Sequence, residues 1–375
     1  MILYLLFLFA GWYALSSFAS WYRLRHFKGP FLASFTHLWL SYGAITGRSW
    51  ETYQDVCETY GSLARLGPDT LVTDDPDLIR RMSAARSPTL DKALHDQLKA
   101  RTTPAYSGRD VPDLEGAVDS VVRHLQRFIR EGIAKSVVAD RFRLDAEKKN
   151  DMLGSFLRHG IDAEQCESEV LLLIIAGSDN TSGTIRATLL YLMTNPRAYQ
   201  RLQREIDEAA ASGQISAPIT NEEAKSLPYL QAVIQEGLRI FSPSGSLLTK
   251  QAPPEGHEFK GHRIPGGVNI GQSTWAMMRR KDIFGEDADV FRPERFLEAD
   301  PKRRDEMEKV VDLNFGYGRW GCSGKPVALM ELNKVFLLRY FDFQLCDPSN
   351  PWAVKTYPVL VTRNMNVIVT ERKLV

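Results

Sequence analysis

The residue with the most evident chemistry is Cys322, which lies in a glycine-rich loop from Phe315 to Gly324 with the sequence FGYGRWGCSG. Glycines on both sides let the backbone approach a flat ligand closely. A helix expected to begin near Lys325 would point the positive end of its dipole at the sulfur and favour the thiolate. Such a thiolate is a metal ligand or a nucleophile, and the lack of a recognisable histidine partner nearby favours the metal ligand. An inert buried cysteine is the alternative.

The same loop contains the pattern GxGxxG between Gly316 and Gly321, so a dinucleotide site is a second interpretation. That site needs further parallel strands downstream, whereas the remaining chain suffices for one helix and a hairpin. Asp342 stands roughly where a ribose-binding acid is expected, but it lies within an aromatic run. A P-loop is excluded because Pro326 follows Lys325 where Ser or Thr is required.

Two charged motifs precede the loop. Glu236 and Arg239 form an ExxR pair, and Arg295 lies in the segment FRPERF. Alone, an i,i+3 ion pair contributes about 0.2–0.5 kcal/mol and is usually a solvated surface pair. In this order, the three motifs together resemble those of the cytochromes P450, in which the loop cysteine is the proximal thiolate ligand of haem iron. The resemblance implies a buried Glu-Arg-Arg cluster that braces the haem loop.

The resemblance also assigns contacts to a b-type haem. It makes Cys322 the iron ligand, with Phe315, Arg319 and Trp320 as further cofactor-binding residues. Position 320 is usually Arg or His in the family, and the Trp indole N–H can still donate to a carboxylate. This variant, with the segments 23–27 and 43–72, is similar to the fungal pisatin-demethylase-like branch.

Two more haem contacts are implied in the first third of the chain. His95 and Lys99 match positions that hold haem propionates in the family. Side chains on a solvated helix are the alternative for these two residues.

The segment from Ala176 to Thr181, AGSDNT, resembles the oxygen-activation segment of the family. The resemblance implies that Asp179 is the proton source and Thr181 a hydroxyl relay. Asn180 stands where Thr is usual; an amide holds a water but relays protons poorly. Polar side chains here are expected to bond back to the i−4 carbonyl. A second membrane span is the alternative, but these polar residues interrupt the apolar run.

The elements expected to position these residues are mainly helical. Helices are predicted over 162–195, 197–211 and 228–240, with helical spacing over 118–129 and a capping box of Asp162 and Gln165. A short hairpin is expected over 63–73, strands and turns over 257–270, and a closing hairpin over 357–370 that turns at Arg363–Asn364. The fold class is therefore mainly α with small β-sheets (α+β), and the resemblance implies a cytochrome P450 fold.

The chain is short for that fold. Between Arg130 and Ile133 the early helical region runs directly into the stretch before the long helix, and a smaller gap falls near Pro88–Thr89. The helices that roof the substrate pocket in the family have no counterpart there. We therefore expect an internally shortened chain that lacks part of the substrate-roof helices.

The first 21 residues are almost unbroken apolar sequence, about the ~20 residues that a membrane-spanning helix needs. A basic cluster from Arg23 to Lys28 follows, which places the rest of the chain on the cytoplasmic side. A cleaved signal peptide is the alternative, but a basic n-region is missing. The prediction is a single-pass anchor over 1–22 in the endoplasmic reticulum membrane and a cytosolic haem-thiolate domain over 23–375, as in the microsomal class.

Composition excludes other classes of protein. The 47 basic and 46 acidic residues give a net charge of +1, which provides no electrostatic footprint for nucleic acid. Four widely spaced cysteines without a CxxC pair exclude a zinc ribbon and a thioredoxin-type motif.

The function implied by the resemblance is a monooxygenase that inserts oxygen from O2 into a small lipophilic secondary metabolite. Its electrons would come from NADPH through a cytochrome P450 reductase. One alternative, motivated by Asn180, is a haem-thiolate isomerase or peroxygenase that does not activate O2. Another, motivated by the missing roof helices, is a truncated, non-catalytic haem or membrane protein.

Overall fold

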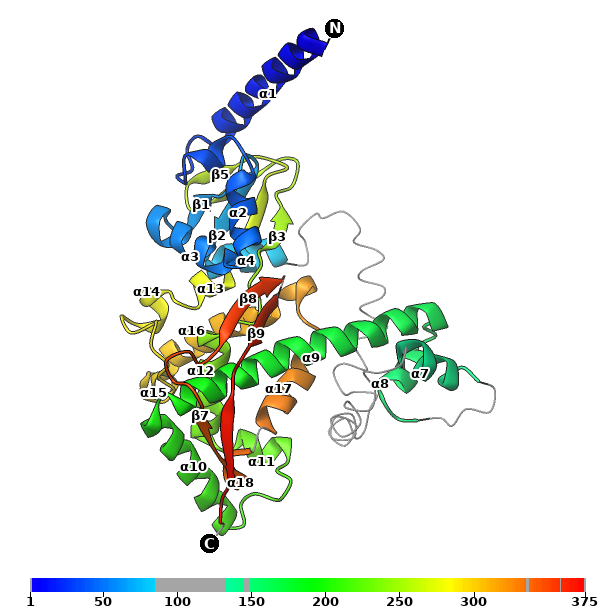
Figure 1. Ribbon diagram of the computed structural model, residues 1–375, viewed down its shortest axis with the longest axis vertical. Helices are drawn as coiled ribbons and strands as arrows, with labels where there is room; N and C mark the ends of the chain where they lie inside the picture. Colours follow the sequence, from blue (N-terminus) through cyan, green and yellow to red (C-terminus); the bar gives the residue numbers. More distant parts are fainter. Residues whose placement is uncertain (1, 85–132, 144–148, 335–336, 358, 374–375) are drawn as a thin grey trace.

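Helices dominate the computed structural model, which describes residues 2–84, 133–143, 149–334, 337–357 and 359–373 (Figure 1). The helices up to the long central one are α1 (Ile2–Leu24), η1 (Leu32–Ser34), α2 (Leu38–Thr46), α3 (Ser49–Tyr60), α4 (Pro76–Ser83), α7 (Ile133–Arg141), α8 (Met152–Arg158) and α9 (Ala163–Met193). The helices after it are α10 (Pro196–Ala211), α11 (Asn221–Lys225), α12 (Pro228–Ile240), α13 (Thr274–Met277), α14 (Lys281–Phe284), α15 (Glu294–Glu298), α16 (Pro301–Val311), η2 (Asp312–Phe315), η3 (Gly318–Trp320), α17 (Lys325–Asn333) and α18 (Leu337–Tyr340).

The strands in the described part of the chain form small sheets. The largest has the order β1-β2-β6-β3, in which β2 and β6 are parallel and the other neighbours antiparallel. Its strands are β1 (Leu63–Arg65), β2 (Thr70–Thr73), β3 (Leu248–Gln251) and β6 (Asn269–Gln272). The antiparallel pairs are β4 (His257–Phe259) with β5 (His262–Ile264), β7 (Phe341–Leu345) with β10 (Val367–Glu371), and β8 (Ala353–Tyr357) with β9 (Val359–Arg363). The predicted mainly helical fold with small sheets is confirmed.

The predicted hairpin over 357–370 is wrong. The turn at Arg363–Asn364 joins β9 to β10, but β9 pairs with β8 and β10 pairs with β7. Asn364 has φ 61°, so the backbone does turn there. Local sequence located the turn, whereas the strand partners come from distant parts of the chain.

The central helices begin and end close to the predicted residues. Asp162 caps α9 by accepting a hydrogen bond from the backbone N–H of Gln165. The return half of the predicted capping box is missing, because the side-chain oxygen Oε1 of Gln165 is buried without a hydrogen-bond partner. Pro196 and Pro228 occupy the first turns of α10 and α12, where their missing N–H groups cost nothing.

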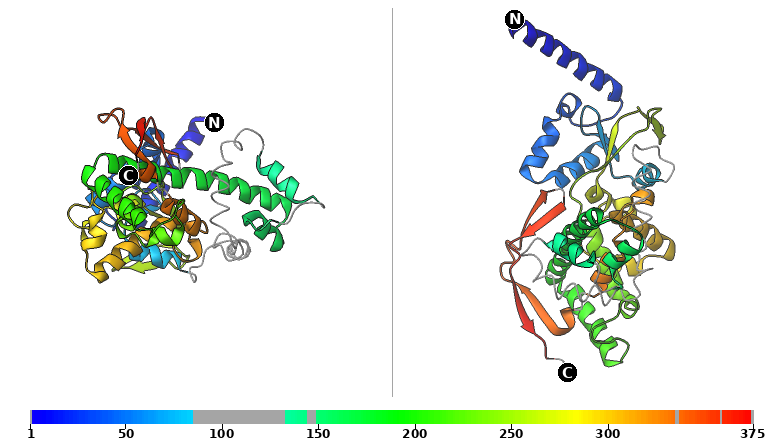
Figure 2. Two further views of the ribbon diagram at one scale, coloured as in Figure 1. Left: turned by 90° about the horizontal axis from the view of Figure 1, so that it is seen from below. Right: turned by 90° about the vertical axis from the view of Figure 1, so that its right-hand side faces the viewer.

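The long helix α9 connects two cores of different size. Its C-terminal half packs with α10 and α12 in the main core, whereas its N-terminal end extends past the main body toward α7 and α8 (Figures 1 and 2). At that end a small second core is formed by Val138, Leu153, Phe156, Ile161 and Cys166. The helical spacing predicted over 118–129 lies outside the described residues.

The N-terminal helix α1 projects from the main body (Figure 1). It exposes large apolar side chains, including Phe7 and Trp12. Among the residues that the structure describes, no helix combines the length and the apolar character that a membrane span requires. The anchor predicted over 1–22 is therefore not confirmed and stays a prediction.

Candidate active site

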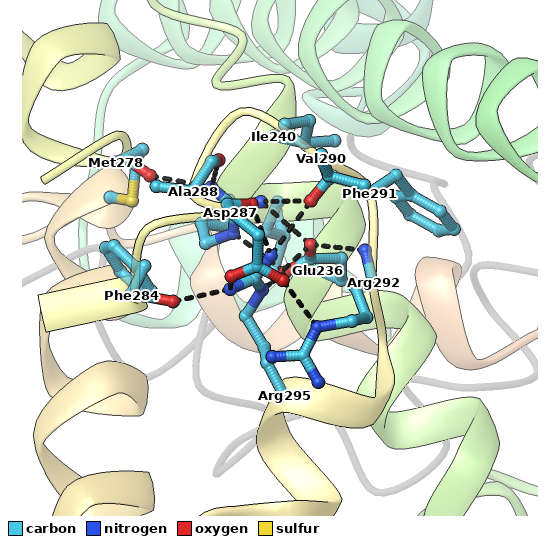
Figure 3. A network of polar contacts seen from close by, with 12 residues as sticks. Glu236, Ile240, Met278, Phe284, Asp287, Ala288, Val290, Phe291, Arg292 and Arg295 are labelled. Carbon is cyan, nitrogen blue, oxygen red and sulfur yellow. Dashed lines mark hydrogen bonds and ion pairs between the residues drawn. The ribbon is translucent and has the colours of Figure 1, made fainter. Parts of the chain in front are cut away.

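Glu236, Arg239 and Arg295 form a buried ionic cluster. Figure 3 shows Glu236 and Arg295 of this cluster. The Glu236 carboxylate accepts two hydrogen bonds of 2.7 Å from Arg239 and two of 3.1 Å from Arg295. The carboxylate and both guanidinium groups are almost completely removed from solvent. The buried Glu-Arg-Arg cluster implied by the sequence is therefore confirmed, and the alternative of a solvated surface pair is wrong.

The same guanidinium groups hold the chain between α13 and α15 against α12. They donate to the backbone carbonyls of Met278, Phe284, Asp287, Ala288 and Val290 over 2.5–3.1 Å. The amide of Asn314 donates to the carbonyl of Leu238 over 3.1 Å, which ties α12 to the residue preceding Phe315. The ionic cluster and this bond brace the cysteine loop from the same helix.

The cysteine loop is a compact turn closed by its own backbone. The N–H of Cys322 donates to the carbonyl of Phe315 over 2.6 Å. Gly318 has φ 56°, and a Cβ placed on it would lie 2.6 Å from the carbonyl oxygen of Ser83 at the end of α4. A side chain at position 318 would therefore push the loop away from α4.

The thiol of Cys322 is exposed and free. The helix α17 begins at Lys325 with Gly324 as its N-cap, and a Cβ placed on Gly324 would lie 3.8 Å from Sγ of Cys322. The sulfur thus lies at the N-terminal end of a helix, where the dipole favours a thiolate. Cys322 is therefore not buried, contrary to the alternative of an inert buried cysteine.

The other loop residues predicted to contact haem differ in exposure. Arg319 is buried, whereas the indole of Trp320 is 40% exposed. Phe315 packs against the main core, with Nζ of Lys325 lying 5.7 Å from the centre of its ring. His95 and Lys99 lie outside the described residues.

The oxygen-activation segment lies near the middle of α9. Asp179 is exposed, Asn180 is half-buried and Thr181 is buried. The amide of Asn180 donates to the carbonyl of Ala176 over 3.0 Å, which is the predicted bond to the i−4 residue. A Cβ placed on Gly177 would meet nothing within 4 Å, so this face of α9 has room for a flat group.

Glu331 of α17 is a residue that the sequence analysis missed. Burial raises the pKa of Glu331, and a hydrogen bond with the hydroxyl of Thr181 opposes that rise. The hydroxyl predicted as a relay is therefore held by a carboxyl group on the helix that follows the cysteine loop. Nothing in the sequence near Glu331 indicates this partner, because α9 and α17 meet only in the folded chain.

Lys250 of β3 is a second missed residue. Burial lowers the pKa of Lys250 to about 8. Its Nζ donates to Oγ of Ser83 over 2.7 Å, and among the described residues no carboxylate pairs with it. The backbone of Ser83 touches the cysteine loop at Gly318, so this cation lies close to the loop. An amine in this position suits a carboxylate supplied by a bound cofactor.

Comparison with known proteins agrees with this geometry. The family described as Cytochrome P450 matches residues 86–370. The cytochrome P450 monooxygenase ABA1 of Pyricularia oryzae is 36% identical, with 93% of each chain covered, and aba1 of Botryotinia fuckeliana is 35% identical over 91% of this chain and 90% of its own. The cytochrome P450 monooxygenase gsfF of Penicillium aethiopicum is 25% identical over 92% of this chain. The chain belongs to the cytochrome P450 family, and it is an oxidoreductase.

The length of these alignments bears on the predicted shortening. The alignment with ABA1 spans 475 positions, more than the 375 residues of the whole chain, although it covers 93% of each protein. Many internal positions of the relative therefore face gaps in this chain. The predicted internal shortening is confirmed.

The described residues fit the haem that membership of the family implies. The exposed Cys322 thiol offers an iron ligand, the open face at Gly177 leaves room for a flat ring, and Lys250 offers a cation for a carboxylate. Family membership also implies a redox partner and a lipophilic substrate.

Proposed function

We propose that this chain is a haem-thiolate monooxygenase that oxidises a small lipophilic secondary metabolite. Its electrons come from NADPH through a cytochrome P450 reductase. The observation that carries the proposal is the exposed Cys322 thiol at the N-terminal end of α17, in a loop braced by a buried ionic cluster. Haem would supply the iron at which O2 is activated, and Cys322 would supply the electron-rich thiolate ligand.

The chain's own residues hold the cofactor in this proposal. Cys322 binds the iron through Sγ, and Phe315 borders the ring. Arg319 and Lys250 would pair with carboxylate groups of the cofactor, and the indole N–H of Trp320 would donate a hydrogen bond to one of them. His95 and Lys99 supply further contacts of the same kind.

Proton handling falls to the middle of α9. Asp179 exchanges protons with solvent through its exposed carboxylate, and the half-buried amide of Asn180 orients a water. The hydroxyl of Thr181 passes a proton on, with its orientation fixed by Glu331. The hydrogen bond with Thr181 lowers the pKa of Glu331 against the rise caused by burial, so the hydroxyl donates to the carboxylate and its oxygen Oγ1 is left to accept a proton.

The reduced protein treated with carbon monoxide tests the proposal directly. A red-shifted thiolate-haem band is expected for the native chain, and Cys322→Ser should abolish it. Cys346 is also exposed and free, so Cys346→Ser is the matched control and should keep the band. A protein that takes up no haem would instead support a truncated, non-catalytic protein.

A peroxide-using enzyme is the second candidate. Asn180 stands where the family usually has the hydroxyl of a Thr, and its amide donates a hydrogen bond to the carbonyl of Ala176. Product formation with hydrogen peroxide should be compared with product formation with NADPH and a reductase. Sustained turnover with NADPH supports the monooxygenase. Turnover with peroxide alone supports the second candidate.

The helix α1 attaches the chain to the endoplasmic reticulum membrane in this proposal, with the catalytic domain in the cytosol. The support is its position outside the main body and its exposed aromatic and aliphatic side chains (Figure 1). Fractionation tests the attachment: the full chain should sediment with membranes and resist extraction by carbonate. A glycosylation site added before residue 2 tests the single-pass orientation.

A further inference from the structure

A cavity of about 410 Å³ lies next to the C-terminal end of α1, here called the foot of α1, and is separate from the cysteine loop. Asp75, the N-cap of α4, lines it, whereas Ser83 at the other end of α4 faces the loop. The eight residues of α4 separate the two sites by about 12 Å. None of the residues assigned to haem binding or proton transfer lines this cavity.

The cavity is formed where the chain leaving α1 meets the β4–β5 hairpin. His26 bonds through Nε2 to the carbonyl of Arg263 at 2.9 Å, which fastens the two segments together. The ring of Phe27 lies 5.7 Å from that of His262, and Phe259 adds a second apolar wall. The cavity is thus built from packed, hydrogen-bonded elements.

Positive charge exceeds negative charge among the lining residues. Lys28, Lys260 and Arg280 line the cavity with Asp75 as the single carboxylate. Asp75 is already engaged, because Oδ2 pairs with Lys260 at 2.5 Å and Oδ1 accepts the backbone N–H groups of Asp77 and Leu78. Among the described residues no carboxylate pairs with Lys28, whose side chain is exposed.

Further donors point to an oxyanion. Arg280 is held at the wall by Asp74 and Asp282, and it donates to the hydroxyl oxygen of Ser62 over 2.9 Å. The hydroxyl of Ser62 is itself hydrogen-bonded to the carboxylate of Asp74, whereas the phenol of Tyr60 lies in the same wall and can donate to an oxyanion. Lysine ammonium groups with neighbouring hydroxyls form charge-assisted hydrogen bonds to phosphate oxygens.

We propose that this cavity binds the phosphate group of a phospholipid headgroup. The lipid source rests on the proposed membrane attachment: α1 ends at Leu24, two residues before His26, so a membrane that holds α1 brings its headgroups to the cavity mouth. Lys28 and Lys260 contact the phosphate oxygens, and Phe27 and Phe259 pack against the glycerol carbons.

The test uses the full chain with two probes. Glycerol 3-phosphate is titrated and followed by ³¹P NMR, and binding to phosphatidylcholine vesicles is compared with and without phosphatidic acid. Lys28→Gln should weaken both interactions about five-fold, and Lys28→Gln with Lys260→Gln further, since each removes one exposed charge contact. Lys302→Gln, an exposed lysine on α16, is the matched control and should change neither.

Each outcome bears on a different claim. Absence of glycerol 3-phosphate binding, or equal weakening in Lys302→Gln, overturns the phosphate site. Binding of glycerol 3-phosphate with vesicle binding insensitive to Lys28→Gln overturns the lipid source. A native chain that binds glycerol 3-phosphate but no vesicle of either composition refutes the membrane attachment and, with it, the lipid source. The single variant Lys28→Gln keeps the test valid if the double variant fails to fold, because the Lys28 side chain is exposed.

Discussion

The two halves of α9 differ in what covers them. From Thr181 onward the helix is packed by α10, α12 and α17, and a ladder of hydroxyl groups bonds back along its carbonyls. Before Ala176, Leu171 and Leu172 are 51% and 54% exposed despite the small core formed with α7 and α8. Within the described residues the ionic cluster and the cysteine loop are both formed on the haem side, whereas apolar side chains of α9 are exposed on the side where the family's roof helices are expected.

The two halves of α9 are therefore stabilised by different neighbouring elements. The covered half depends on α12, which carries the buried ionic cluster and packs closely against α9 through Gly237. The open half packs against α7 and α8 through the small second core. Substitutions in the two halves should therefore change the free energy of unfolding in opposite directions or by different amounts.

The largest effect is expected from Glu236→Ala, which leaves Arg239 buried without its carboxylate and Arg295 with only the half-buried Asp287. The free energy of unfolding should fall by about 3–5 kcal/mol, measured by urea unfolding. Glu222→Ala on α11 removes another i,i+3 ion pair, with Lys225, but on an exposed surface, and should cost about 0.5 kcal/mol or less. Equal losses in the two variants would show that the cluster does not support the covered half.

Gly237→Ala should be the next most damaging change. A Cβ there would lie 2.2 Å from Oγ1 of Thr188, so α12 would be forced away from α9. We expect a loss of about 1–3 kcal/mol in the free energy of unfolding. Thr188→Ala removes that oxygen and should restore part of the loss in the double variant, whereas strict additivity would contradict the close contact.

Gly177→Ala, on the other side of the comparison, should act in the opposite direction. A Cβ at this position meets nothing within 4 Å, and alanine is favoured over glycine inside a helix by about 0.5–1 kcal/mol. Chemical unfolding of the haem-free chain should therefore show increased stability. Haem titration of the same variant should show weaker uptake, and unchanged uptake would refute the placement of the ring beside Gly177.

The smallest effect is expected at the junction of the two halves, from Glu331→Gln. Burial raises the folded-state pKa of Glu331, so the folded protein binds this proton more tightly than the unfolded chain does. The native protein should therefore lose stability relative to the variant as pH rises from about 4.3, the unfolded value, through the raised folded value. Thermal unfolding at several pH values measures this, with the exposed Glu306→Gln as the matched control.

The sequence predicted those parts of the site whose residues lie close together along the chain. The loop around Cys322, the ExxR pair and the capped helix α9 each depend on residues within a few positions of one another, and each was located correctly. Lys250 and Glu331 were not predicted because their hydrogen-bond partners are distant in the sequence. Lys250 bonds to Ser83, and Glu331 bonds to Thr181. The prediction of a C-terminal hairpin was wrong for the same reason, since β9 and β10 pair with β8 and β7 and not with each other.

The sequence by itself therefore determined the family, the helical frame and the residues capable of haem-thiolate chemistry, because motifs, caps and periodicity act over short separations. The tertiary structure alone decided that Glu236 accepts from two buried arginines, that Glu331 holds Thr181 and that a cationic cavity forms at the foot of α1. Burial and charge pairing depend on which distant segments pack together. Only the folded chain fixes those neighbours, and with them the protonation states on which the proposed chemistry depends.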